Sequence, residues 1–323
     1  MKTNIFKSVA ILTIATAFTA CESSDSSNNY PTAAQFREME TAALNSVKQH
    51  FTFDASIGVT ATSEHSVNIV IPAGSLIKNG VTVTGMVDLE FIEIFDGGLM
   101  AVTGKPTRGI TPDGKLAMLI SGGEFFLQAT QNGEVLEIDP SQNITLVVPP
   151  DNDQPNPDMS LWQGVVTDTI TGSNDAFVWQ PIGQGVNAGA IGIEGYYCSF
   201  GNFGWTNVDC FYSDPRPKTT ILARVPEGYD NNNSTVYLSY DGQGHSLAKL
   251  DTYTADGLFS EHYGQIPIGL ECHAIFMTVQ NGTYKYAIKP VVITDGGIIN
   301  FTASETVTGT KDQLIAAINA VQN

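Results

Sequence analysis

The side chains best suited to chemistry are concentrated in one stretch, GYYCSFGNFGWTNVDCFY, at residues 195–212. Trp205, Asn207 and Asp209 alternate along it, so on a β-strand their side chains share one face. An aromatic ring beside two polar groups commonly contacts a sugar or a peptide. In the alternative interpretation Trp205 packs in the core while Asn207 and Asp209 hydrogen-bond the neighbouring turn. Both interpretations stay open, and these three residues are the candidate ligand contacts.

Two cysteines, Cys198 and Cys210, flank the same stretch, with Gly204 at their midpoint. A hairpin that turns at Gly204 would place them on opposed strands, about 4.5–5.5 Å apart at Cα, which suits the separation of about 5.5 Å in disulfides. The sequence therefore predicts a Cys198–Cys210 disulfide. Cys272 leaves two alternatives: a bond from either cysteine to Cys272, or three reduced thiols.

The usual catalytic signatures are missing from the sequence. It contains no GxSxG elbow, no HExxH, no paired CxxC and no phosphate-binding loop. We therefore expect no catalytic residue, no metal site, no cofactor and no enzymatic activity. A hydrolase with an unrecognised carboxylate site is the less favoured alternative, since 33 acidic residues allow many pairs.

The first 20 residues have the features of a secretory signal peptide. Lys2 and Lys7 precede an apolar run at residues 9–20, which is shorter than the roughly 20 apolar residues that span a bilayer. The sequence FTAC that ends at Cys21 resembles the lipobox of bacterial lipoproteins, with Phe18 at the position that usually holds Leu. This resemblance implies cleavage before Cys21 and acylation, such as palmitate, on its thiol.

The segment after the lipobox, residues 21–30, is polar and acidic and is expected to be a disordered tether. The chain is similar in this respect to secreted lipoproteins of the Bacteroidota, in which acidic residues near the lipidated Cys direct export to the cell surface. Glu22 and Asp25 occupy such positions. The resemblance implies a lipid anchor in the outer membrane, with the periplasmic or the surface face left open.

The charge of the chain limits its partners. With 33 Asp and Glu against 15 Lys and Arg, the formal net charge is −18. Such a chain is not expected to bind nucleic acid, or anionic lipid by charge. The expected partners are the membrane, through the lipid anchor, and a protein or a glycan in the envelope.

The hydrophobic pattern predicts a mainly β protein with two antiparallel β-sandwich domains and short terminal helices. Apolar residues at helical spacing, with Thr32 as a cap, predict a helix over residues 32–50. A second helix is expected at 310–322, where Thr310 and Gln313 fit a capping box. Short alternating segments between them predict strands, with Asn132-Gly133 as a hairpin turn.

Residues 57–148, including NIVIPAGSLIKNG and SGGEFFLQATQNGEVLEI, resemble the ZU-type β-sandwich of ankyrins, netrin receptors and tight-junction scaffolds. This resemblance implies a fold and no activity. The first domain is expected at 31–150, a Pro-rich linker at 151–160 and the second sandwich at 161–323.

These observations favour a lipid-anchored envelope protein with a non-catalytic binding or scaffolding role. The alternative is a glycan-capturing surface lipoprotein, which would expose a platform of aromatic rings. The chain has three tryptophans for such a platform, Trp162, Trp179 and Trp205.

Overall fold

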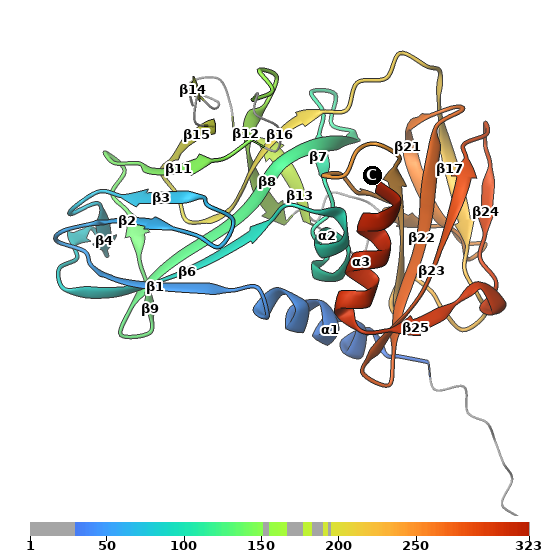
Figure 1. Cartoon of the computed structure of the whole chain (residues 1–323), viewed down its shortest axis with the longest axis horizontal. Helices are drawn as coiled ribbons and strands as arrows, with labels where there is room; N and C mark the ends of the chain where they lie inside the picture. The colour runs from blue at the N-terminus through green and yellow to red at the C-terminus, as the bar shows by residue number, and fades with distance from the viewer. Residues whose placement is uncertain (1–29, 151–154, 167–176, 183–189, 193–194, 323) are drawn as a thin grey trace, which may run out of the picture.

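The computed structural model describes residues 30–150, 155–166, 177–182, 190–192 and 195–322, and it is mainly β, as the sequence predicts. The expected signal peptide, Cys21 and residues 22–29 of the tether lie outside these residues. Figure 1 shows two β-rich halves with helices between them. The helices are α1 (Ala33–Asn45), α2 (Gly97–Thr103) and α3 (Lys311–Gln322), with a 3₁₀ turn, η1, at Ala303–Glu305.

The N-terminal half is a sandwich of two sheets. The larger has the order β1-β6-β8-β16-β12-β13-β7, with β9 beside β8, and the smaller has the order β14-β15-β11-β3-β2. A third, short sheet has the order β10-β4-β5. The larger sheet comprises β1 (Gln49–Asp54), β6 (Met86–Ile94), β7 (Arg108–Ile110), β8 (Leu116–Gln131), β9 (Glu134–Val135), β12 (Ser160–Val166), β13 (Phe177–Pro181) and β16 (Gly204–Phe211). The others comprise β2 (Val59–Thr62), β3 (Asn68–Ile71), β11 (Ile144–Val148), β14 (Ala190–Gly192), β15 (Gly195–Phe200), β4 (Leu76–Lys78), β5 (Val81–Thr82) and β10 (Glu137–Ile138).

Alternating apolar residues of these strands fill the space between the two sheets. Ile69 and Ile71 of β3 face Leu89 and Phe91 of β6 in one buried cluster, as expected for sheets with one apolar face each. The Asn132-Gly133 turn joins β8 to β9 with positive φ at both residues, so the predicted hairpin is confirmed.

Part of the larger sheet closes on itself. β8 pairs with β16, β16 with β12, β12 with β13, β13 with β7, and β7 again with β8. The register of β8 and β16 shifts between Asn207 and Asp209, and Gly123 on β8 has φ +130°. Such a bulge bends a strand and increases its twist, which helps these five strands form a closed ring.

The C-terminal half is a second sandwich. Its sheets have the orders β20-β21-β17-β24 and β19-β18-β22-β23-β25. Phe276, Leu238 and Ala223 belong to the apolar cluster between them. The strands are β17 (Lys218–Arg224), β18 (Ser234–Tyr240), β19 (Ala248–Lys249), β20 (Thr252–Tyr253), β21 (Phe259–Pro267), β22 (Glu271–Gln280), β23 (Thr283–Val292), β24 (Ile298–Asn300) and β25 (Val307–Gly309).

The boundary between the two halves, as the strand pairing defines it, lies further along the chain than the expected linker at residues 151–160. β12, β13 and β16 complete the larger N-terminal sheet, and β15 pairs with β11 of the smaller one. The N-terminal half therefore extends to Phe211, and the C-terminal sandwich begins with β17 at Lys218. The prediction placed these strands in the second domain because the composition changes at 151–160, whereas long-range pairing determines the division.

The helices join the two halves. Phe36 of α1 and Leu314 of α3 share an apolar cluster with Ile92 of β6 and Ile275 of β22. The predicted cap at Thr32 is present and forms a capping box with Gln35, and the predicted capping box of Thr310 with Gln313 is also present. α1 ends at Asn45, earlier than predicted, because residues from Gln49 pair with β6 as β1. No helix among the described residues is both long and apolar enough to cross a membrane.

The predicted Cys198–Cys210 disulfide is wrong in this structure. Cys198 on β15 lies opposite Leu146, whereas Cys210 on β16 lies opposite Ile120 in the other sheet. The chain crosses between sheets at residues 201–203 and does not turn back as a hairpin. The three described cysteines, including Cys272, are buried free thiols, which corresponds to the fully reduced alternative.

Candidate functional site

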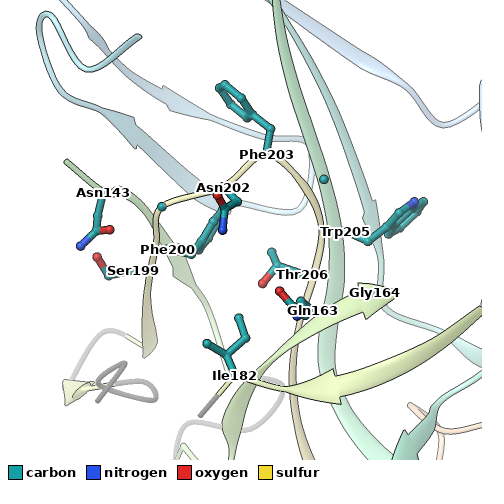
Figure 2. A pocket seen from close by; sticks show the side chains of 12 residues that line it. Asn143, Gln163, Gly164, Ile182, Ser199, Phe200, Asn202, Phe203, Trp205 and Thr206 are labelled. Atoms are coloured by element: carbon teal, nitrogen blue, oxygen red, sulfur yellow. The ribbon is translucent and has the colours of Figure 1, made fainter. Parts of the chain in front are cut away.

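An open pocket of about 430 Å³ lies where the chain crosses from β15 to β16 (Figure 2). We call it the corner pocket. It lies between the two N-terminal sheets, where Ser199 and Phe200 come from β15 of the smaller sheet and Thr206 comes from β16 of the larger sheet. Its lining consists of Asn143, Gln163, Gly164, Ile182, Ser199, Phe200, Gly201, Asn202, Phe203, Gly204, Trp205 and Thr206.

Among the residues that the structure describes, those that line the corner pocket carry no ionisable side chain. Its polar groups are the carboxamides of Asn143, Gln163 and Asn202, all solvent-exposed, and the hydroxyls of Ser199 and Thr206. A carboxamide both donates and accepts hydrogen bonds. An apolar floor with a few convergent polar groups is the usual composition of a small-ligand site, and this set suits a neutral ligand rich in hydroxyls.

Trp205 borders the corner pocket but does not present its ring to it. Figure 2 shows the indole pointing away from the pocket centre. The ring packs against Phe126, Phe177 and Trp179, with centroid separations of 5.4, 6.0 and 6.4 Å. The indole is partly buried, so the interpretation of Trp205 as a core residue fits its surroundings better than a stacking contact.

Asn207 and Asp209 share the face of Trp205, as their alternation predicts, but they point into the closed ring. Both are 0% exposed. Asn207 donates to the carboxylate of Asp209 at 2.5 Å and accepts from the Ser121 hydroxyl at 3.0 Å. The predicted contact of these two residues with a ligand is therefore wrong in this structure, because the closed ring excludes solvent from them. The alternative was also incomplete, because their partners lie on β8 and β16 and not in a turn.

Glu124 of β8 adds a second buried acid to this polar group. It lies opposite Asn207 and is 0% exposed. Burial, then the nearby Asp209, raise the pKa of Glu124 well above its usual range, with Lys105 and a hydrogen bond from the Trp179 side chain acting in the opposite direction. Burial also raises the pKa of Asp209 well above its usual range. Sequence reasoning missed Glu124, because it stands in the apolar strand segment GEFFLQAT.

A second acid pair, Asp251 and Glu261, lies between the two halves of the protein. Both line a cavity of about 30 Å³ that also contacts Arg108 of β7. Burial and Asp251 raise the pKa of Glu261 to about 7, while backbone N–H groups of residues 263–265 act in the opposite direction. A cavity of this volume holds about one water molecule, so a substrate could not reach this pair.

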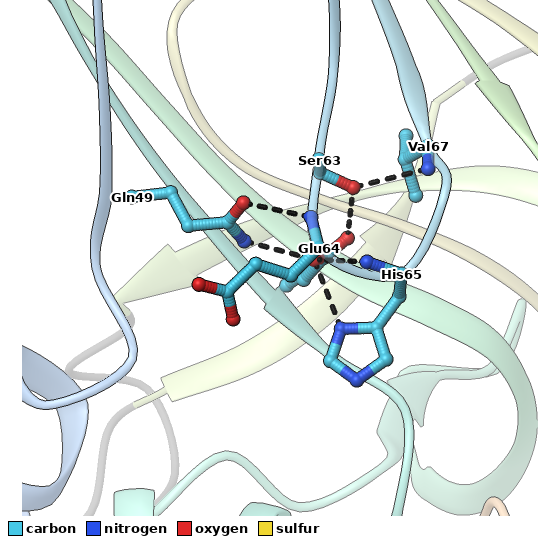
Figure 3. Close-up of polar contacts among 6 residues, drawn as sticks. Gln49, Ser63, Glu64, His65 and Val67 are labelled. Carbon is cyan, nitrogen blue, oxygen red and sulfur yellow. Dashed lines mark hydrogen bonds and ion pairs between the residues drawn. The ribbon is translucent and has the colours of Figure 1, made fainter.

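Ser63, His65 and Glu93 form a polar cluster of the types used in nucleophilic catalysis (Figure 3). Glu93, 2% exposed, accepts from the Ser63 hydroxyl at 2.6 Å and contacts His65 Nδ1 at 2.9 Å. A catalytic triad instead requires the hydroxyl to donate to the imidazole. The Ser63 hydroxyl also accepts from the backbone of Val67 at 3.0 Å. The cluster thus links the β2–β3 turn to β6. The one sign of this cluster in the sequence is the acidic residue Glu93 within the apolar segment FIEIF.

The other residues singled out from the sequence are buried. Trp162 and Trp179 are 2% and 0% exposed, so a platform of three exposed tryptophans is not present. Burial raises the pKa of Cys198 to about 12 and that of Cys210 to about 11. Within the described residues, no group of three or more His, Cys, Asp or Glu side chains could hold a metal ion.

Comparisons with protein-family models, curated proteins and solved structures gave no match to this chain.

Proposed function

We propose that this protein is a non-catalytic binding protein of the bacterial envelope, and that its corner pocket takes a neutral, hydroxyl-rich ligand such as a glycan. The observation that carries this proposal is the chemistry of the pocket lining. In a chain of net charge −18, the described residues of the pocket lining present three carboxamides and two hydroxyls, and none of them has an ionisable side chain. Ligand hydroxyls can donate to and accept from such groups without the cost of desolvating a charge.

The glycan would not be bound by a platform of exposed tryptophan rings, which the sequence analysis gave as the expectation for a glycan-capturing protein. The lining includes the rings of Phe200, which is 7% exposed, and Phe203, together with the Ile182 side chain. The ligand would therefore be held mainly by hydrogen bonds at the rim, with a small apolar contact below. Sites that depend on hydrogen bonds to hydroxyls discriminate strongly against analogues that lack them.

The position of the acids supports a binding role over hydrolysis. A carboxylate-based hydrolase needs two acids that flank the scissile bond in one accessible site. Glu124 and Asp209 are enclosed by the ring, and Asp251 and Glu261 line a cavity of about 30 Å³. The corner pocket is lined by no Asp or Glu in the described part of the chain.

The envelope location rests on the N-terminal sequence. The signal peptide and the lipobox that ends at Cys21 favour an acylated N-terminus. Each buried methylene of an acyl chain contributes about 0.8 kcal/mol to membrane binding. We expect Cys21→Ser to move the protein from the membrane fraction to the soluble fraction, and a variant that stays with the outer membrane would contradict lipid anchoring.

The ligand proposal is tested by screening residues 22–323 on an array of neutral and charged glycans and measuring affinities by calorimetry. We expect retention of neutral glycans. The double variant Gln163→Ala/Asn202→Ala should weaken binding about fivefold or more, since each of the two lost hydrogen bonds is worth about 0.5–1.5 kcal/mol.

The matched control is Asn45→Ala, an exposed carboxamide at the end of α1, which should leave the affinity unchanged. Binding that is equally weakened by both variants, or unaffected by the double variant, would place the ligand elsewhere. Failure of every neutral glycan to bind would contradict the proposed ligand class.

A further inference from the structure

In the described part of the chain, β1 is the longest strand that lies at the end of a sheet. It has six residues, Gln49–Asp54, and it pairs with β6 on one side only. Of the other strands at sheet ends, β2 has four residues and the rest have two or three. Figure 1 shows β1 leaving α1 and running along the border of the N-terminal half. The outer edge of β1 is therefore available to a further strand.

Three residues of β1 direct their backbone groups to this outer edge. The N–H group of Ala55, just after β1, donates to the carbonyl oxygen of Gly85, just before β6, at 2.9 Å. In an antiparallel pair, every second residue bonds to the partner strand. Counting back from Ala55, the residues between those that bond to β6 are Asp54, Thr52 and His50. Their N–H and C=O groups form an edge on which a strand can be added.

The edge of β1 lacks the features with which proteins commonly block strand addition, such as Pro, Lys or a bulge. Gln49–Asp54 contains neither Pro nor Lys, and its register against β6 has no shift. Other edges of this protein do have such features. The part of β23 that β25 does not cover contains Pro290, and the Lys289 ammonium donates to the backbone carbonyl of Asn300 on β24. The fold therefore leaves β1 open where it blocks comparable strands.

The sequence of β1 is complementary to a second, antiparallel copy of itself. With Thr52 on the twofold axis, each His50 lies opposite Asp54 of the second copy. The His50 side chain is exposed and that of Asp54 is partly exposed, and directly opposed side chains on antiparallel strands are close enough to interact. The imidazole can donate to the carboxylate. This pair occurs twice in the dimer, so the charges match in this register.

The apolar residues of β1 match in the same register. Phe51 lies opposite Phe53 of the second copy. Both rings face the core of the N-terminal sandwich, where Phe53 is buried and Phe51 is only partly buried at the border. An added strand would cover the exposed part of Phe51 with a second ring, and aromatic cross-strand pairs stabilise a sheet. The pairing would thus extend the apolar core from one copy into the other.

We propose that the protein forms a twofold dimer in which β1 pairs antiparallel with β1 of a second copy about Thr52. The larger N-terminal sheets of the two copies then form one continuous sheet. The main-chain groups of His50, Thr52 and Asp54 make the hydrogen bonds, and the two His50–Asp54 pairs set the register. No residue of β1 lines the corner pocket, so the proposal stands if that pocket proves to bind nothing.

The test is sedimentation velocity of residues 22–323 over a range of concentrations, at about 150 mM salt to screen the repulsion between two chains of net charge −18. We expect a reversible monomer–dimer equilibrium. Thr52→Pro removes the central N–H from both copies, and the loss of two hydrogen bonds should weaken the dimer about fivefold or more. Because this N–H points away from β6, the variant should still fold.

The matched control is Thr60→Pro in β2, the neighbouring strand at a sheet end. The N–H group of Ser63 donates to Val67, so by the same alternation the N–H group of Thr60 points away from β3. Thr60→Pro should leave the dimer unchanged. Circular dichroism checks that both proline variants are folded.

A charge exchange tests the register without proline. His50→Asp places a carboxylate opposite the Asp54 carboxylate, and Asp54→His places two imidazoles opposite each other. Each variant alone should be monomeric at concentrations where the parent is half dimeric. Their equimolar mixture should dimerise again, because every carboxylate then lies opposite an imidazole. A parent that stays monomeric at every concentration, a dimer weakened equally by Thr60→Pro, or a mixture that stays monomeric would each overturn the proposal.

Discussion

The side-chain nitrogen of Asn207 lies 2.5 Å from the carboxylate oxygen Oδ2 of Asp209, and both residues are completely buried inside the closed ring. This hydrogen bond links two residues of one strand at the point where the register of β16 against β8 shifts. The pair therefore belongs to the structure of the ring and is not exposed to a ligand in the corner pocket.

We expect Asp209→Ala to destabilise the fold. The substitution removes the partner of the buried Asn207 amide, and an unpaired buried polar group costs about 1–3 kcal/mol. Urea unfolding should show the loss, while the affinity of the folded variant for its glycan should stay within about twofold of the parent's, because Asp209 does not line the pocket. A variant with unchanged stability and abolished binding would restore Asp209 as a ligand contact.

Stability should fall as the pH rises from about 4.5 to 7. The folded protein holds the Glu261 proton up to a pKa of about 7, whereas the unfolded chain releases it near 4.5. Between these values the folded state binds more protons, so the free energy of unfolding decreases with pH, by up to about 3 kcal/mol for this group. The raised pKa values of Glu124 and Asp209 act in the same direction.

Urea unfolding at pH 5 and pH 8 measures this dependence. Glu261→Gln cannot ionise and should reduce the difference between the two values, whereas Glu38→Gln, an exposed residue of α1, should not. If the wild-type protein were equally stable at both pH values, or if Glu261→Gln left the difference intact, the account of this acid would be wrong.

The cysteines should behave as unreactive thiols. Cys198, Cys210 and Cys272 are buried, and burial raises the pKa of each, to about 12, 11 and 12 respectively. The thiolate is the reactive form, so a thiol reagent should label them only after denaturation. A Cys198–Cys210 cross-link in a non-reducing peptide map would contradict the placement of these residues in different sheets.

Gly98→Ala should disturb the packing of α2 on α3. A methyl group at Gly98 would lie 2.6 Å from the carbonyl oxygen and 2.8 Å from the Cα atom of Ile315. Backbone atoms cannot move aside as a side chain does, so we expect a loss of about 1–3 kcal/mol or more, typical of overpacking. At Gly201 the added methyl would lie 3.3 Å from the Asn143 side chain and 3.7 Å from the Gln142 carbonyl oxygen, the latter an ordinary contact, so Gly201→Ala should cost less. Equal stabilities in thermal melts would refute the close contact of the two helices.

Local signals in the sequence predicted the local parts of the fold. The capping residues Thr32 and Thr310 mark helix starts that the structure contains. The alternation of Val67, Ile69 and Ile71 predicted a strand with one buried face, and all three are buried. These features depend on residues within a few positions of one another, and their periodicity is enough to specify them.

Long-range pairing could not be predicted from the same signals. Nothing near Phe211 indicates that its strand lies beside Leu119, and this pairing is what moves the boundary of the N-terminal half and separates the two cysteines. The helix α2 was also missed, because Gly97 and Gly98 are poor helix formers. In the structure these glycines allow α3 to approach closely.

The candidate site was predicted in part. The stretch around Gly204 does border the corner pocket, and the shared face of Trp205, Asn207 and Asp209 is correct. Whether the side chains on that face are exposed to solvent depends on closure of the five-stranded ring. This closure results from long-range strand pairing, which the local sequence does not predict. The residues that contact the pocket instead include Asn143 and Gln163, which come from segments with no distinctive motif.

The most direct test of the central claim is an NMR titration that follows the side-chain amide resonances of Asn143, Gln163 and Asn202 as a neutral glycan from the array is added. The account predicts saturable shifts of all three with one dissociation constant, while the amide of Asn45 stays in place. Saturable binding that leaves the three pocket carboxamides unshifted would contradict the assignment of the corner pocket as the ligand site.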